Sequence, residues 1–132
     1  MYKLIMLIKK RPDLTREQFI DYYDNRHVPF MHSILPRGAA VHRRNFVIPA
    51  AVAPGSAGDS PAAAADADYD VISEVFYEDL ETANNARRAL EDPELFRLMR
   101  EDEHKFLLPD SIRRFVVEVH ETVYRPIAGK GI

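Results

Sequence analysis

The feature that most constrains the fold is the stretch 14–33, LTREQFIDYYDNRHVPFMHS, which predicts one amphipathic helix with a well-marked start. Thr15 and Gln18 have the spacing of a capping box, and Leu14 and Phe19 stand at the N′ and N4 positions of a hydrophobic staple. These two signals make Thr15 the predicted N-cap. Counted at helical period, one broad face carries Tyr22, Tyr23, Arg26, His27 and Phe30.

The helix is predicted to end or kink just after His27, because Pro29 disfavours a helical conformation at Val28. His27 is then expected to point inward, beside aromatic side chains and near a helix end. A titratable imidazole in such surroundings is the strongest candidate for a functional group in this chain.

The other ordered segments follow from apolar periodicity and from turn residues. Predicted strands cover residues 2–9, 37–48, 69–78 and 111–124, and a second helix covers residues 80–90. Asp92 and Pro93 open a further helix as N-cap and first helical residue. The apolar stripe of that helix is predicted to carry Leu95, Met99 and Phe106, with Asp102 in the same phase.

The resulting order, β-α-β-β-α-(α)-β, predicts an α+β chain with the ferredoxin-like arrangement, in which a four-stranded antiparallel sheet carries its helices on one face. The strands are apolar on both sides, and the first of them is expected to be buried on both faces. A second copy of the chain is therefore expected to cover the open face, giving a homodimer with a shared barrel.

Length and composition predict a single domain over residues 1–132, since 46% of the residues are hydrophobic and 30% are charged. The formal net charge of −3 argues against nucleic acid and acidic membranes as partners. The chain has no cysteine and no segment resembling a signal peptide or a membrane span, so a soluble cytoplasmic protein is expected. Residues 49–68, rich in Ala, Pro, Gly, Ser and Asp, predict a mobile loop that folding does not require, and residues 125–132 form a tail.

Four segments in this order resemble the EthD family of the dimeric α+β barrel superfamily. They are LTREQFIDYYDNRHVPFM, YDVISEVFYEDLETANNA, PELFRLMREDEHKFLLPDS and FVVEVHE. The resemblance implies a function like those of the proteins that look like this one. These are accessory factors of ether degradation, dehydratases and cyclases of polyketide and pigment pathways, and lactone isomerases. The wider superfamily includes cofactor-free monooxygenases and haem peroxidases. Carried over by position, the family's first-helix histidine falls on His27, its third-strand acid on Glu74, and its acid before the last strand on Asp102. The long Ala/Pro loop departs from the family pattern.

His27 has two interpretations. As a general acid and base, its neutral imidazole takes and returns a proton near pH 7. Alternatively, it is an interior histidine that is hydrogen-bonded to the backbone. Asp24, three residues earlier, either orients the ring or is a solvated surface acid.

Glu74 in the middle of a strand is costly to bury unless it is paired or protonated. It either shares proton transfer with His27 in one pocket, with a raised pKa, or it forms an ion pair with Arg26, Arg43 or Arg44 or faces water at an edge position. Asp102 is expected to reach the same pocket. The helix-face aromatics are expected to bind the ligand, although such a set is also typical of plain core; they are Tyr22, Tyr23 and Phe30.

No metal or cofactor is expected. The five histidines have neither the HExxH spacing nor a 2-His-1-carboxylate spacing, and the chain lacks GxGxxG, P-loop and GxSxG motifs; they are His27, His32, His42, His104 and His120. The expected function is a cofactor-free dehydratase, cyclase or isomerase that acts on a hydrophobic cyclic or aromatic metabolite. The alternatives are a non-catalytic accessory or ligand-binding protein and a cofactor-free monooxygenase.

Overall fold

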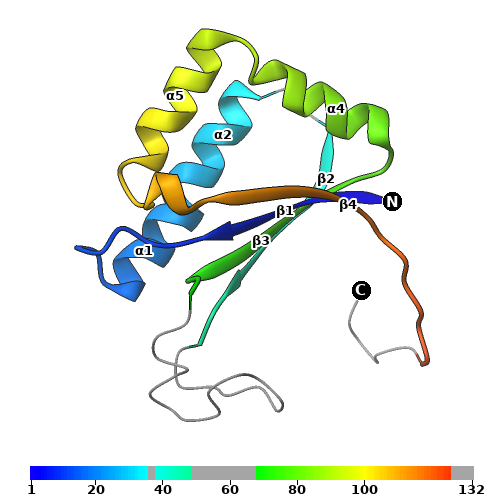
Figure 1. Ribbon diagram of the computed structural model, residues 1–132, viewed down its shortest axis with the longest axis horizontal. Helices are drawn as coiled ribbons and strands as arrows, with labels where there is room; N and C mark the ends of the chain where they lie inside the picture. Colours follow the sequence, from blue (N-terminus) through cyan, green and yellow to red (C-terminus); the bar gives the residue numbers. More distant parts are fainter. Residues whose placement is uncertain (36–37, 49–67, 126–132) are drawn as a thin grey trace.

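The computed structural model describes residues 1–35, 38–48 and 68–125 (Figure 1). Its strands are β1 (Tyr2–Ile8), β2 (Ala39–Phe46), β3 (Val71–Tyr77) and β4 (Arg113–Glu118). Its helices are α1 (Arg16–Tyr22), the π-helix η1 (Tyr23–His27), α2 (Val28–Ile34), α4 (Leu80–Ala89), α5 (Pro93–Glu103) and the short 3-10 helix η2 (Pro109–Ser111). The loop predicted at 49–68 and the tail predicted at 125–132 lie outside the described residues, apart from Asp68 and Arg125.

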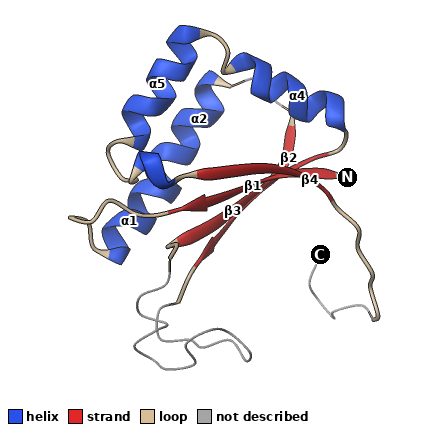
Figure 2. Cartoon of the chain, viewed as in Figure 1, coloured by secondary structure: helices blue, strands red, loops and turns tan. Residues whose placement is uncertain are grey.

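The four strands form one antiparallel sheet in the order β2-β3-β1-β4. The helices lie on one face of this sheet, as Figure 2 shows. The predicted α+β class and the ferredoxin-like strand order are therefore confirmed. None of the helices in the described parts of the chain is both long enough and apolar enough to cross a membrane.

The capping box at the start of α1 is formed as its spacing predicts. The Thr15 side chain accepts a hydrogen bond from the Gln18 backbone N–H at 3.1 Å. The Gln18 side chain in turn accepts one from the Thr15 backbone N–H at 2.9 Å. Two N–H groups that the helix itself leaves without partners are thus satisfied, which fixes where the helix begins.

The predicted end of the helix after His27 is wrong, since helical backbone continues through Val28 at φ −60° and ψ −50°. The irregularity instead precedes Pro29: residues 23–27 form η1, and the Val28 N–H bonds to the carbonyl of Tyr23. In a regular α-helix the proline ring collides with the carbonyl four residues back. The wider π turn moves that carbonyl away and lets the helix pass the proline.

The core lies between the helices and the sheet face that they cover. Its fully buried side chains come from β1, α1, η1, β3 and the turn after α5; they are Ile8, Phe19, Tyr23, Val71, Phe106 and Leu107. Phe106 follows the end of α5 rather than lying on the helix as predicted, yet it is fully buried. This core packs α1, η1 and the turn after α5 against the sheet.

The opposite face of the sheet has no helix over it (Figure 2). Because side chains alternate along a strand, Ile5 and Leu7 of β1 point to this face, while Met6 and Ile8 point to the core. Apolar side chains of the neighbouring strands are exposed here: Val41 by 44%, Ile72 by 38% and Phe115 by 49%. Within one chain β1 is therefore covered on one face only, and burial of its other face remains a prediction that depends on the second copy.

Candidate functional site

His27 and Asp102 form a buried pair between η1 and α5. The Nδ1 atom of His27 lies 2.7 Å from Oδ2 of Asp102, and their side chains are only 11% and 10% exposed. The π-helical segment turns both Tyr23 and His27 into the core, with ring centroids 5.6 Å apart. Asp102 reaches His27 from the last turn of α5, on the inward face that its spacing from Leu95 predicts.

Tyr22 holds the second oxygen of the same carboxylate. Its hydroxyl donates a hydrogen bond to Oδ1 of Asp102 at 2.6 Å. A carboxylate only accepts hydrogen bonds, so His27 donates through Nδ1–H and its Nε2 carries the free lone pair. No hydrogen bond to Nε2 is formed within the described part of the chain. The arrangement thus presents an oriented imidazole whose Nε2 can take a proton.

The electrostatics favour this protonation state. Burial lowers the pKa of His27, and the Asp102 hydrogen bond and charge only partly oppose that effect. The imidazole is therefore neutral near pH 7. Burial and the Asp102 carboxylate raise the pKa of Tyr22 to about 12, so its phenol keeps the proton that it donates.

The other two aromatics of the predicted ligand site lie elsewhere. Tyr23 is core: its ring packs against Phe19, Phe46 and Phe106, and its hydroxyl lies 2.7 Å from Oγ of Ser73. Phe30 is half-buried on α2 and belongs to none of the aromatic contacts found among the described residues. The core interpretation of this aromatic set therefore describes Tyr23, whereas Tyr22 is bonded to Asp102.

Glu74 is not brought together with His27 within one chain. It follows Ser73, whose side chain meets Tyr23 on the helix side, so Glu74 points to the open face of the sheet. There it accepts a hydrogen bond from Lys3 Nζ at 2.7 Å and one from Asn45 at 3.2 Å. The hydrogen bond from Lys3 lowers the pKa of Glu74, so the expected raised value is wrong. The ion-pair interpretation holds, with Lys3 in place of the predicted arginines.

Asp24 does not orient His27 either. Its Oδ1 accepts a hydrogen bond from Nε of Arg44 at 2.6 Å, which ties η1 to β2. The orienting role considered for Asp24 falls to Asp102.

His42 is a polar core residue that the sequence motifs do not identify. It lies on the same face of β2 as Phe46, and its ring centroid is 6.0 Å from that of Tyr23. Its Nε2 is buried and has no hydrogen-bond partner in the described residues. Side chains alternate between the two faces of a strand, so counting back from Phe46 in steps of two places His42 on the inner face. This alternation could have identified His42 as an inward residue from the sequence.

Stability should fall in mild acid because of His42. Burial, with the positive charge of Arg44, lowers the pKa of His42 from 6.5 to about 4. Below pH 6.5 the unfolded chain therefore gains a proton at this position that the folded chain does not take until about pH 4. The shift corresponds to at most about 3 kcal/mol, which solvent screening of the partly exposed ring reduces to about 1–2 kcal/mol.

Urea unfolding at pH 7 and at pH 4.5 measures this loss. His42→Gln should lose less stability between the two pH values than the wild type, whereas His104→Gln, at an exposed position, should match the wild type. An unchanged pH dependence in His42→Gln would contradict the burial argument.

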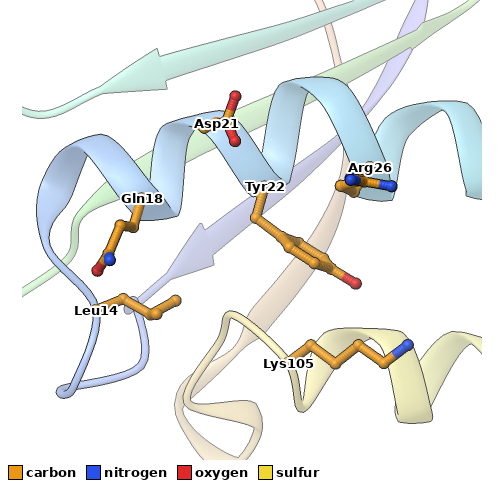
Figure 3. Close-up of a pocket in the computed structure, with 6 residues that line it drawn as sticks. All are labelled: Leu14, Gln18, Asp21, Tyr22, Arg26 and Lys105. Atoms are coloured by element: carbon orange, nitrogen blue, oxygen red, sulfur yellow. The ribbon is translucent and has the colours of Figure 1, made fainter.

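An open depression of about 480 Å³ lies on the outer side of Tyr22. Its lining residues come from the turn before α1, from α1 itself, from η1 and from the turn after α5; they are Leu14, Gln18, Asp21, Tyr22, Arg26 and Lys105. Figure 3 shows the Tyr22 hydroxyl directed between Arg26 and Lys105. Within the described ranges no group of His, Asp and Glu side chains is placed to hold a metal ion.

Comparisons with known proteins agree with this architecture. Two solved structures have the same fold: an ethyl tert-butyl ether D (EthD) family protein from Bacillus halodurans C-125 and an EthD-like protein from Ralstonia eutropha JMP134. The first is 21% identical, with a TM-score of 0.57 over 91% of this chain and 99% of the other. The second is 17% identical, with a TM-score of 0.57 over 94% and 95% of the two chains.

None of the curated proteins matches the chain. The EthD domain, in contrast, matches over residues 11–110, a stretch that includes His27, Glu74 and Asp102. Since that match spans most of the chain, the protein belongs to the EthD family.

Proposed function

We propose that this EthD-family protein is a homodimeric, cofactor-free enzyme of the dehydratase, cyclase or isomerase type, acting on a hydrophobic cyclic or aromatic metabolite. The observation that carries the proposal is the 2.7 Å contact of His27 with Asp102, which itself accepts the Tyr22 hydroxyl. A buried carboxylate that holds an imidazole in one tautomer is a common device for general base catalysis. The resemblance of the chain to EthD dehydratases, cyclases and isomerases supports the same reaction class.

In the proposed reaction, Nε2 of neutral His27 takes a proton from a C–H next to a carbonyl of the substrate. The imidazolium that forms is stabilised by the Asp102 carboxylate, and Tyr22 keeps that carboxylate in place. The proton then returns to another atom of the substrate. Delivery to a carbon completes an isomerisation, and delivery to a departing hydroxyl releases water and completes a dehydration.

A ligand-bound crystal structure tests the site. The proposal expects an atom of the bound metabolite within roughly 3.2 Å of His27 Nε2, the reach of a proton transfer. A ligand bound out of reach of His27 would contradict it.

A second candidate, an accessory or ligand-binding protein without catalysis, is favoured by one observation: His27 does not line the depression beside Tyr22. Product analysis after incubation with the identified ligand separates the two functions. Conversion of the ligand supports the enzyme, and recovery of unchanged ligand supports the binding protein.

The homodimer is supported by the uncovered face of the sheet. Apolar side chains from all four strands face the same side; they are Ile5, Leu7, Val41, Ile72, Phe76, Phe115 and Val117. Burying such a face against a second copy removes it from water, at about 25 cal/mol per Å² of apolar surface. The structural neighbours have this fold, and the proposed barrel follows from pairing two such sheets.

Light scattering should therefore give a mass twice that of the 15.2 kDa chain at micromolar concentration. Phe115→Asp should give monomers, because it places a charge in the proposed interface. Phe96→Asp is the matched control, since Phe96 is 47% exposed on α5, away from the open face. A monomeric wild type would contradict the dimer.

A further inference from the structure

Two basic side chains line the depression beside Tyr22, and neither has a close ion-pair partner among the described residues. Arg26 is exposed and forms no ion pair with another described residue. Lys105 is 63% exposed, and its one partner there is Asp102 Oδ1 at 3.9 Å, the outer limit of an ion pair. Figure 3 shows both side chains on the same side of the depression, flanking the Tyr22 hydroxyl.

One acidic residue, Asp21, also lines this depression. Its carboxylate accepts a hydrogen bond from the Asn25 side chain at 2.8 Å. Asp102, whose Oδ1 lies 3.9 Å from Lys105 Nζ, adds a second carboxylate, so the two cations face two acidic groups. An anion held by both cations is therefore expected to be a monoanion, because the two carboxylates repel the second charge of a dianion.

Apart from Gln18, the remaining lining of the depression is an aromatic ring and an aliphatic side chain. The Tyr22 ring lies over Phe106, with centroids 5.0 Å apart, and its hydroxyl is fixed by Asp102. Leu14 adds an aliphatic side chain beside it. A ring held at both its face and its hydroxyl is a rigid platform for another ring.

We infer that this depression binds a small aromatic carboxylate, with the carboxylate between Arg26 and Lys105 and the ring against Tyr22 and Leu14. The planar guanidinium of Arg26 suits a bidentate contact with a carboxylate. The inference goes beyond the proposed function, because His27 does not line this depression. Tyr22 and His27 bond to the same Asp102, so the anion site and the imidazole are one carboxylate apart.

Benzoate is the probe, and its binding to the full-length protein is measured by NMR chemical-shift titration. The chemical shifts of Tyr22 and its neighbours should change with benzoate concentration and reach a plateau. Acetate, which lacks the ring, and inorganic phosphate, which carries a second charge near Asp21, should both bind more weakly. Arg26→Gln and Lys105→Gln should each weaken benzoate binding about fivefold, the scale of one exposed charge pair.

Arg88→Gln is the matched control, because Arg88 is an exposed arginine on α4 that does not line the depression. It should leave benzoate binding unchanged. The inference is overturned if benzoate does not bind, if it binds equally well to Arg26→Gln and Lys105→Gln, or if phosphate binds better than benzoate. The two hypotheses fail separately, because this experiment measures binding and not turnover. Absence of benzoate binding does not contradict catalysis by His27. Full turnover in His27→Ala does not contradict the anion site.

Discussion

Turnover of the identified substrate should fall by roughly 10²–10⁴-fold when His27 is replaced by alanine, the contribution typical of a positioned general base. Asp102→Asn should also lower kcat, by at least about tenfold, because an amide no longer fixes the tautomer or stabilises the imidazolium. KM should change less than kcat in both variants, since neither group is proposed to hold the substrate in its ground state.

His104→Ala is the control for these assays, because His104 is exposed just beyond α5 and should leave kcat unchanged. The pH profile gives an independent check. Since burial lowers the pKa of His27 below its usual 6.5, kcat/KM should rise with pH through that lowered value and be level above pH 6.5. Full activity in His27→Ala would show that the proposed mechanism is wrong.

The largest loss of stability is expected for Phe106→Ala, about 3–5 kcal/mol. Phe106 is fully buried, and its ring centroid lies within 6 Å of those of Phe19, Tyr22, Tyr23 and His27. Its removal leaves a cavity under the residues that form the site. Thermal unfolding should show a melting temperature lower by roughly 10 °C or more.

Two variants serve as controls for this measurement. Phe106→Leu keeps most of the volume and should lose far less stability than the alanine variant. Phe96→Ala, at a position 47% exposed, should lose less than about 1 kcal/mol. Equal losses at Phe96 and Phe106 would contradict the assignment of Phe106 to the core.

The local features of the fold could be predicted from the sequence. The capping box at Thr15 depends on two residues three apart, and the position of Asp102 depends on helical spacing from Leu95. Such patterns are contained in one segment. The π turn before Pro29 was missed, because the preference against helix at Val28 is a local one that the packing of Tyr23 and His27 overrides.

Relations between segments were harder to predict. Placing Glu74 beside His27 required knowing which face of β3 meets the helices, and a shift of one residue exchanges the two faces. Ser73 is buried against Tyr23, which shows that its face of β3 meets the helices. A serine is not apolar, so the sequence pattern does not mark this position as buried. The partners Lys3 and Arg44 likewise come from strands distant along the chain, so spacing could not identify them.

The most direct test of the central claim, that His27 and Asp102 act as one unit, is an NMR titration of the His27 imidazole. Asp102 raises the pKa of His27 against the effect of burial, so Asp102→Asn should lower the midpoint further below 6.5. Glu74→Gln should leave the midpoint unchanged, because Glu74 lies on the other face of the sheet. An unchanged midpoint in Asp102→Asn, or a shifted one in Glu74→Gln, would contradict the account.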